Sequence, residues 1–355
     1  MTGVWLGRPV LVPGEQTVDQ GQLALRMDTT LAACGAPSRL RQQAAFVFQR
    51  AGVARRHFEL SLDESAARRD WFRATGRASE RLARRALEAV DSSVLGACDG
   101  LVCVSSSHAG FPSLSRVLQD GLGLARSTLC FDLAGLGCAG PTHGLFLADT
   151  LLSRGACAAV CVVCVDVMGT QSALRRHVTV PTVAQIVAHG LASDAAGVVV
   201  VRRQPWPGAV LYYQDAALRS DLWPGSLDQN DLNACEHNEP FLAVGKEIRT
   251  RLTDEIAPLL ESLHGSTFIL HPGGKALMTA LGGARPELGE SIAIASDVLE
   301  DHGNIGAASL MWVLGRALER ELPLAPRTTL FALGPGIVST ALTLDAVTMA
   351  EEAAA

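Results

Sequence analysis

The sequence predicts an α/β protein in which helices cover both faces of the sheets. Apolar, strand-like runs alternate with helix-like segments along most of the 355 residues. The strand-like runs are apolar throughout instead of alternating, as in strands that lie between two layers of helices. The same rhythm occurs before and after residue 203. We therefore expect a duplicated α/β unit, with halves at 1–203 and 204–355, although the halves share no visible sequence similarity.

In the N-terminal half, predicted strands and helices follow one another at short intervals. The strands are expected at 100–106, 129–133, 158–165 and 197–201, and the helices at 114–122 and 143–153. The segment 204–208, Gln-Pro-Trp-Pro-Gly, interrupts this pattern and separates the halves. The C-terminal half continues with helices predicted at 242–263 and 307–318 and strands at 267–270 and 329–333.

Composition limits the classes of function. Hydrophobic residues make up 48% and charged residues 19%, which is typical of a well-packed enzyme or an obligate oligomer. The net charge is -6 and there is no basic stripe, so nucleic acid is not expected as a partner. Nine cysteines scattered through apolar runs favour reduced thiols. With no secretory signal pattern and no apolar run long enough for a membrane span, we expect a cytoplasmic protein.

Three short motifs, far apart in the sequence, carry the chemistry of one active site. They are Leu136-Gly-Cys-Ala-Gly140, Leu270-His-Pro-Gly-Gly274 and Asp301-His-Gly-Asn-Ile305. Each places a reactive or hydrogen-bonding side chain, Cys138, His271 or Asn304, beside glycines and next to an apolar run. A thiol, an imidazole and an amide together are suited to acyl transfer through a thioester.

Each of the three residues also has a structural interpretation. Cys138 begins a helix-like segment, where a helix N-terminus would favour a thiolate, but it could be one more buried thiol. His271 follows a strand and could be structural, and Asn304 is an ordinary residue for a turn. Cys161 and Cys164 form a bare CxxC inside a strand and point to opposite faces, so we interpret them as core and predict no metal site.

Together the motifs resemble those of the type III polyketide synthases, the chalcone-synthase-like branch of the thiolase superfamily. The resemblance extends from about residue 50 to 344. Its segments are Gly137–Gly140, His271–Gly274, His302–Asn304, Leu333–Gly336, Ser107–Pro112 and Arg50–His57. The His-Pro-Gly-Gly and Gly-Pro-Gly motifs distinguish this family from the related β-ketoacyl synthases III.

This resemblance implies a thiolase-like, duplicated five-layer αβαβα fold and a homodimer. It implies an acyltransferase in which Cys138 accepts a starter acyl group, with His271 and Asn304 assisting. Malonyl-CoA would then lose carbon dioxide and extend the chain repeatedly before cyclisation. Coenzyme A thioesters would be substrates, no cofactor would be permanently bound, and the starter could arrive on coenzyme A or on an acyl carrier protein.

The resemblance also implies which residues shape the cavity. Substrate-binding positions are Phe111, Ala192, Phe241, Gly306, Gly334, Pro335 and Gly336, and those near the coenzyme A entrance are Arg50, Arg55 and Arg56. Ala192 stands where plant-type members usually carry a gatekeeping phenylalanine. Because a small residue there should widen the entrance, we hypothesise a long or carrier-bound acyl starter.

Two alternatives remain open at this stage. One is a single condensation or acyl transfer of the β-ketoacyl synthase III kind. The other is a non-catalytic partner that keeps only the fold, in which case Cys138 would react no faster than Cys235. The starter, the number of extensions and the mode of cyclisation are not determined by these motifs.

Overall fold

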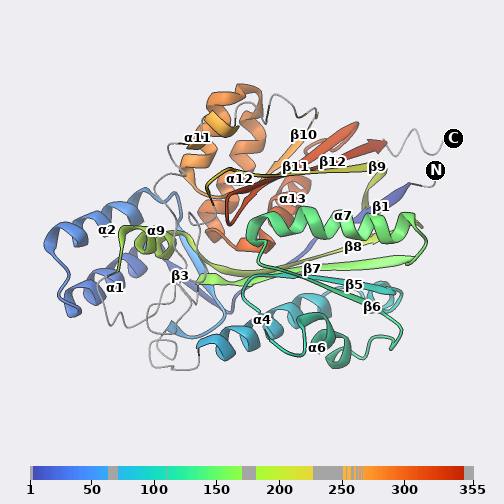
Figure 1. The fold of residues 1–355 in the computed structure, drawn as a ribbon, viewed down its shortest axis with the longest axis horizontal. Coiled ribbons are helices and arrows are strands. Elements are labelled where there is room, and N and C mark those ends of the chain that lie inside the picture. The colour runs from blue at the N-terminus through green and yellow to red at the C-terminus, as the bar shows by residue number, and fades with distance from the viewer. Residues whose placement is uncertain are drawn as a thin grey trace.

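The computed structural model describes residues 3–62, 71–108, 110–169, 181–226 and 267–347, with residues 251, 252, 254–256, 260, 263 and 265 between the last two ranges. Within this part of the chain, one ten-stranded mixed sheet has the order β10-β11-β12-β9-β1-β8-β7-β5-β6, with β2 paired to β8. A second sheet pairs β3 with β4. Figure 1 shows these strands at the centre of the molecule with helices above, between and below them.

The strands of the N-terminal half are β1 (Val4–Gly7), β2 (Val10–Pro13), β5 (Gly100–Ser105), β6 (Leu129–Ala134), β7 (Ala159–Val167) and β8 (Asp194–Arg202). β5 pairs in parallel with β6 and β7, whereas β8 runs antiparallel to β7. β5 and β7 are buried along their whole length, as their uninterrupted apolar sequences predict. Because β5 and β7 are parallel, polar side chains at their carboxyl ends can meet at the same edge of the sheet.

The strands of the C-terminal half are β9 (Ala209–Leu222), β10 (Thr267–Leu270), β11 (Arg327–Gly334) and β12 (Val338–Val347). β10 and β11 are parallel, and β12 runs antiparallel to both β11 and β9. β1 joins the halves because it pairs with β8 on one side and β9 on the other. The predicted boundary at 203 falls between β8 and β9; the division into two domains stays a prediction.

Helices and sheets alternate in five layers (Figure 1). The helices of these layers are α4 (Trp71–Glu88), α6 (Leu114–Gly121), α7 (Gly140–Ser153), α11 (Lys275–Ala284), α12 (Gly289–His302) and α13 (Ser309–Glu319); the short α5 spans Ser92–Gly96. α4 and α6 cover the outer face of the N-terminal strands, and α12 packs against β10. α7 contacts strands of both halves, as does α13. α13 is consequently buried on almost all sides.

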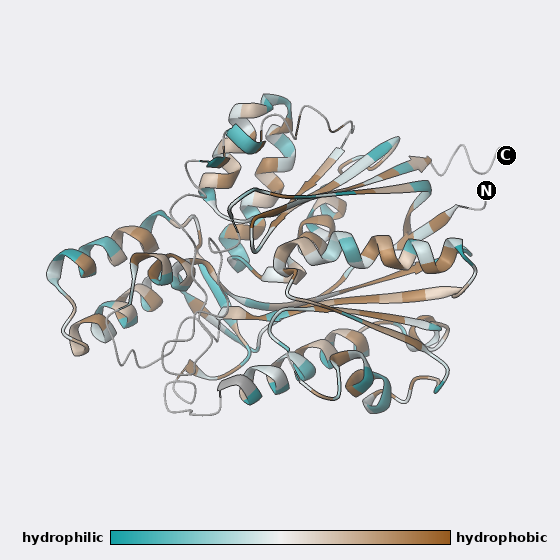
Figure 2. Ribbon diagram, viewed as in Figure 1, coloured by the Kyte–Doolittle hydropathy of each residue, from teal (hydrophilic) through white to brown (hydrophobic). Residues whose placement is uncertain are grey.

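A small helical lobe stands apart from the five layers. It contains α1 (Gln20–Ala33), α2 (Ser38–Arg50) and α9 (Val183–Leu191), next to β3 (Gln16–Asp19) and β4 (Arg55–Phe58). Its core includes Leu23, Leu31, Phe48 and Ile186. Figure 2 shows hydrophobic residues concentrated in the central layers and hydrophilic ones on the outer faces of the lobe. The lobe lies beside the carboxyl ends of the strands and so can form one wall of a site there.

Most predicted elements appear where the sequence places them. The exception is the helix predicted at 242–263, which lies almost entirely outside the described residues. Residues 50–57 do not form one continuous helix. α2 ends at Arg50 and the chain then enters β4.

Candidate active site

Cys138 lies in a tight turn between β6 and α7. A single helical turn, Gly137–Ala139, leads directly into α7, which begins at Gly140 with a proline in its first turn. The amide of Gly137 donates to the Ser106 Oγ at 2.9 Å. Gly137 has φ +49°, and a Cβ on it would lie 2.7 Å from Pro335 Cδ. Glycine is thus required here, because the Gly-Pro-Gly loop presses against the turn.

His271 directly follows β10 and continues its pairing with β11. Its backbone amide donates to the Phe331 carbonyl at 2.9 Å, and its own carbonyl accepts from the amide of Gly273. His271 is 3% exposed, and within the described residues neither ring nitrogen makes a hydrogen bond of good geometry, although the Asn304 side chain lies close enough to act on the imidazole. Buried polar atoms without partners are uncommon in folded proteins. Two such nitrogens at a strand end are therefore available to a substrate.

Asn304 lies in the loop between α12 and α13. Its amide donates to the Leu191 carbonyl at 2.8 Å, and its carbonyl accepts from Ser193 at 2.9 Å, so the loop is bound to the end of α9. Asn304 Oδ1 accepts from the amide of Gly306 at 3.0 Å and from Cys138 Sγ at 3.5 Å. Because these contacts occupy Oδ1, the side-chain NH₂ is the group left to donate to another molecule.

The three side chains line one cavity of about 1180 Å³. Its apolar wall includes Val183, Val187, Leu191, Leu277, Ala280 and Leu333. Arg39, Arg50 and Lys275 are its charged lining residues, apart from the catalytic candidates. Among the described residues, no aspartate or glutamate lines this cavity. The site therefore combines a largely apolar interior with cationic residues, which suits an acyl chain attached to an anionic carrier.

Burial keeps the two ionisable candidates neutral. It raises the pKa of the Cys138 thiol to about 12; the Asp166 charge adds to this shift and the Asn304 side chain opposes it. Burial also lowers the pKa of His271 to about 4, again with Asn304 acting in the opposite direction. Desolvation thus outweighs the helix dipole, which by itself would favour a thiolate at this position.

Asp166 is a buried residue of the site that the sequence analysis missed. It lies on β7, is 0% exposed and accepts hydrogen bonds from the amides of Ser106, Ser107 and Ala307. Burial raises its pKa to about 6, although these three amides lower it. The signal was present in the sequence: one carboxylate inside an otherwise apolar nine-residue strand.

Several predicted cavity residues are where the resemblance implies. Ala192, Gly334 and Pro335 all line the cavity. Gly306 and Gly336 do not, which corrects two of the predicted substrate contacts. Gly306 lies behind Asn304, where a Cβ would come within 2.5 Å of Asp166 Oδ2. The Gly336 carbonyl instead accepts a hydrogen bond from Ser226.

The three predicted arginines differ sharply in position. Arg50 lines the cavity and stacks on Phe46 at 5.0 Å. Arg55 is exposed and forms an ion pair with Asp301 at 2.6 Å. Arg56 is 0% exposed and donates to the carbonyls of Ala192 and His189, so the prediction that it meets coenzyme A was wrong. It stabilises the backbone beside Asn304 because strand β4 directs it inward.

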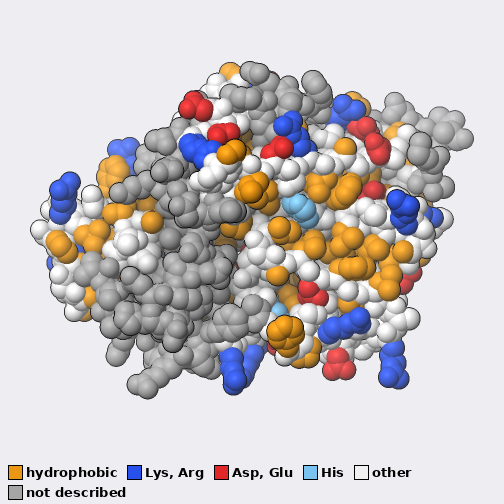
Figure 3. All heavy atoms as spheres, viewed as in Figure 1, with side chains coloured by type: hydrophobic (Ala, Val, Ile, Leu, Met, Phe, Trp, Pro, Cys, Tyr) orange, Lys and Arg blue, Asp and Glu red, His pale blue; other side chains and the backbone are white. Residues whose placement is uncertain are grey.

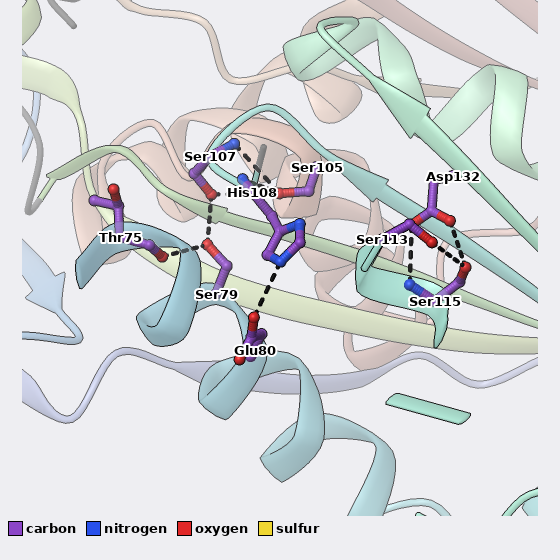
Figure 4. A network of polar contacts seen from close by, with 9 residues as sticks. All are labelled: Thr75, Ser79, Glu80, Ser105, Ser107, His108, Ser113, Ser115 and Asp132. Carbon is purple, nitrogen blue, oxygen red and sulfur yellow. Dashed lines mark hydrogen bonds and ion pairs between the residues drawn. The ribbon is translucent and has the colours of Figure 1, made fainter. Parts of the chain in front are cut away.

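Phe111 is fully exposed and does not line the cavity of its own chain. The residues before it are fixed by a polar network with α4, which Figure 4 shows: His108 Nε2 is 3.1 Å from Glu80 Oε1, and Ser107 Oγ is 2.8 Å from Ser79 Oγ. Phe111 is thus exposed to solvent a few residues beyond a segment that hydrogen bonds fix to α4. The other predicted aromatic residue, Phe241, lies outside the described residues.

The CxxC pair is part of the core, as predicted. Cys161 belongs to the cluster between β7 and the outer helices, and Cys164 to the cluster between the two halves. The two thiols therefore lie on opposite faces of β7. Among the described residues, no helix combines the length and the apolar character needed to cross a bilayer.

Similarity to known proteins identifies the family of this chain. No family model matches the sequence. The chain is 30% identical over 314 residues to 1,3,6,8-tetrahydroxynaphthalene synthase of Streptomyces peucetius subsp. caesius, covering 81% of this chain and 79% of that protein. In structure it resembles the tetrahydroxynaphthalene synthase of Streptomyces coelicolor A3(2), a bacterial type III polyketide synthase, with TM-score 0.82 and 19% identity, over 97% and 99% of the two chains.

Two further structures share the fold at 17% identity and TM-score 0.81. They are CsyB complexed with CoA-SH, aligned over 97% of this chain and 100% of that one, and the C-terminal type III polyketide synthase domain of Steely1 from Dictyostelium, aligned over 98% and 100%. The predicted thiolase-like fold is confirmed by these neighbours.

Fold and relatives together define an acyl-transferring condensing enzyme. The chain belongs to the type III polyketide synthases. Its reaction is the iterative condensation of an acyl thioester starter with malonyl-CoA, followed by cyclisation of the polyketide. The substrates are coenzyme A thioesters, and no permanently bound cofactor is used.

Proposed function

We propose that Cys138 carries the growing acyl chain and that His271 and Asn304 bind the thioester oxygens. The observation that carries this proposal is the convergence of the three side chains on one cavity of about 1180 Å³. The contact of 3.5 Å between Cys138 Sγ and Asn304 Oδ1 adds to it, as does the buried His271 imidazole, whose ring nitrogens make no well-formed hydrogen bond among the described residues. Both the nucleophile and the donors then face the same substrate.

Loading begins with two neutral groups. The Cys138 sulfur attacks the carbonyl carbon of the starter thioester as its proton passes to the imidazole of His271. The tetrahedral intermediate collapses, the coenzyme A sulfur leaves, and it takes the proton back from His271. Thiolate and imidazolium stabilise each other during this exchange, which offsets the desolvation that holds the pKa of Cys138 near 12 and that of His271 near 4.

Extension needs donors but no added base. The carboxylate of malonyl-CoA leaves as carbon dioxide, and its electron pair forms an enolate whose charge develops on the thioester oxygen. The NH₂ of Asn304 and an N–H of His271 would donate to that oxygen in a site that excludes water. The enolate carbon then attacks the acyl carbonyl on Cys138 and releases the sulfur. Asn304 is well suited to this task because Gly306 fixes its orientation.

We propose a long, aliphatic starter for this enzyme. The wall beyond the reaction centre is formed by valine, leucine and alanine side chains from α9 and α11, and Ala192 provides no bulky gate. Such a surface gains free energy with every methylene that it buries, about 0.8 kcal/mol each. A compact aromatic starter would leave much of the cavity unfilled.

The starter proposal is tested with a panel of acyl-CoA thioesters of increasing chain length, together with benzoyl-CoA. Product masses after incubation with malonyl-CoA give the preferred length and the number of two-carbon units added. We expect kcat/KM to rise from short to long chains. A preference for short or aromatic starters, with long chains inert, would contradict the proposal, and delivery of the same acyl group on a carrier protein distinguishes the donor.

The cationic residues of the cavity fit the anionic end of coenzyme A. Arg39 and Arg50 come from α2, and Lys275 begins α11 on the opposite wall. We propose that they attract the phosphates while the acyl chain enters the apolar part. Replacing Arg50 with glutamine should raise KM for acyl-CoA and weaken its salt dependence with little change in kcat.

We propose a homodimer in which the partner covers the exposed Phe111. β6 pairs with β5 alone among the described strands, which leaves one edge of the sheet open. Hydrophobic side chains gather on the face of the molecule that carries α7 (Figure 3). Within α7, Phe146, Leu147 and Leu151 are only half-buried. These features favour association with a second copy. Sedimentation as a monomer at micromolar concentration would contradict it.

We also propose a cytoplasmic location. The eight described cysteines are free thiols, in keeping with a reducing compartment. Cell fractionation with an antibody against the chain tests this, and recovery in a secreted fraction would contradict it.

A further inference from the structure

We propose that Asp166 is a positioning residue whose buried carboxylate couples the turn that carries Cys138 to the loop that carries Asn304. This inference goes beyond the catalytic roles proposed above and rests on them in one respect, the identity of Cys138 as the nucleophile. It assigns a task to a buried carboxylate whose charge acts on the Cys138 thiol.

Each oxygen of the carboxylate binds a different catalytic segment. Oδ1 accepts from the amide of Ser106 at 2.7 Å and from that of Ser107 at 3.1 Å. Oδ2 accepts from the amide of Ala307 at 2.8 Å. On the first side, Ser106 Oγ accepts from the Gly137 amide, the residue before the nucleophile. Two hydrogen bonds thus connect Asp166 to the Cys138 turn.

The connection from Asp166 to Asn304 also involves few hydrogen bonds. Ala307 is three residues beyond Asn304, and the intervening Gly306 donates to Asn304 Oδ1. Gly306 has φ +57°, and a Cβ there would lie 2.5 Å from Asp166 Oδ2 and 2.6 Å from Met168 Cε. The loop therefore rests directly on the carboxylate, and only glycine permits this approach. Any displacement of Asp166 would move the Asn304 loop with it.

The serines that Asp166 binds are held from the outside as well. Ser107 Oγ accepts from the amide of Val167 at 2.9 Å and contacts Ser79 of α4 (Figure 4). The segment is thereby fixed between α4 and β7, so Asp166 connects a rigid support to the Asn304 loop. This arrangement is typical of the shell that orients catalytic groups.

The charge of Asp166 also acts on the nucleophile. It adds to the desolvation that raises the pKa of Cys138. The carboxylate itself has a pKa of about 6 and is ionised at neutral pH. The other titratable groups at this place are the imidazole of His271 across the cavity and the Cys164 thiol on β7, whose pKa Asp166 also raises. The charge of Asp166 therefore favours the uncharged form of the Cys138 thiol.

The test separates position from charge with Asp166→Asn. The amide can accept from Ser106 and Ser107, but its NH₂ then faces the donating amide of Ala307, which breaks the link to Asn304. We expect the pH midpoint for iodoacetamide alkylation of Cys138 to fall by roughly one unit, about a tenfold faster alkylation at a fixed pH. We expect malonyl-CoA decarboxylation to fall at least about tenfold. A merely structural role would lower both rates and leave the midpoint in place.

Asp99→Asn is the matched control. Asp99 also accepts from backbone amides of Ala158 and Ala159, but at the amino end of β7, roughly 20 Å along the strand from Asp166. It should leave both measurements unchanged. An unchanged decarboxylation rate in Asp166→Asn, an alkylation midpoint that is unchanged or higher, or equal effects in Asp99→Asn would overturn the proposal.

A second variant covers the case in which Asp166→Asn does not fold. Ser106→Ala removes the acceptor for the Gly137 amide but keeps the charge of Asp166. Acyl loading of Cys138 should slow while the alkylation midpoint shifts by much less than in Asp166→Asn, and an unchanged loading rate would overturn the coupling. Failure of these tests leaves the role of Cys138 standing, since that is judged separately from loss of acyl loading in Cys138→Ala.

Discussion

The reaction centre and the helical wall of the cavity differ in how their side chains are held: the first by hydrogen bonds, the second by apolar packing. At the reaction centre, backbone amides, Asp166 and Ser106 fix Cys138 and Asn304 through hydrogen bonds between 2.7 and 3.5 Å. The wall formed by α9 and α11 presents mostly small and aliphatic side chains to the cavity, and the bonds that hold α9 involve its backbone carbonyls, such as that of Leu191. Chemistry therefore depends on fixed donors, whereas substrate range depends on the size of individual side chains. Changes at the centre should affect rate, and changes in the wall should affect selection.

Removing the nucleophile should produce the largest effect and should separate the reaction centre from the wall. Cys138→Ala should lower polyketide formation by at least ~10³-fold, because no acyl-enzyme can form. Binding of acyl-CoA, measured by calorimetry, should change little because the apolar wall is intact. Substantial condensation by this variant would mean that the thiol has no covalent role.

Asn304 tests whether the centre works through donation. Asn304→Ala should lower malonyl-CoA decarboxylation by ~10²- to 10³-fold while Cys138 is still acylated. It also leaves the Gly306 amide without an acceptor, which costs about 1–3 kcal/mol of folding free energy. Asn304→Asp is the control that keeps an acceptor for Gly306 but loses the donor. Equal rate losses in both variants support donation, and a near-normal rate in Asn304→Asp would contradict it.

Ala192 tests the wall. Ala192→Phe restores a bulky gate and should change the ratio of kcat/KM for long against short starters by about tenfold or more in favour of short ones. Overall decarboxylation should change less than in the Asn304 variants. Ala45→Phe, at an exposed position of α2 that does not line the cavity, is the matched control. An unaltered preference would remove Ala192 from the determinants of starter length.

The smallest expected effect is a pH-dependent change in stability. His271 stays neutral in the folded protein down to pH about 4, whereas in the unfolded chain it binds a proton below about pH 6.5. Its contribution therefore lowers stability as pH falls from 6.5 to 4, by about 2 kcal/mol at pH 5. In His271→Gln, the loss of unfolding free energy between pH 7 and pH 5 should shrink by this amount. Denaturant titrations at both pH values measure it, and an identical loss would contradict the neutral, buried imidazole.

The sequence predicted what depends on local pattern. Uninterrupted apolar runs predicted β5 and β7, and three distant glycine-containing motifs predicted that Cys138, His271 and Asn304 share one site. The sequence could not show in which direction an individual side chain points. Arg56 looks like Arg55 in the sequence, yet strand alternation buries one and exposes the other. Asp166 was passed over because its partners are backbone amides, which no sequence motif records.

Desolvation was the second property hidden from the sequence. A cysteine at a helix N-terminus predicts a low pKa, but the cavity around Cys138 removes it from water and reverses the shift. Gly306 shows a similar limit, since its fit against Asp166 depends on two loops that meet only in the folded chain.

The measurement that tests the central claim most directly is peptide mapping of the enzyme after brief incubation with a long-chain acyl-CoA and no malonyl-CoA. We predict that the acyl mass is found on the peptide containing Cys138 and that it disappears when malonyl-CoA is added. An adduct on any other cysteine, or none in an enzyme that still makes polyketide, would contradict the account.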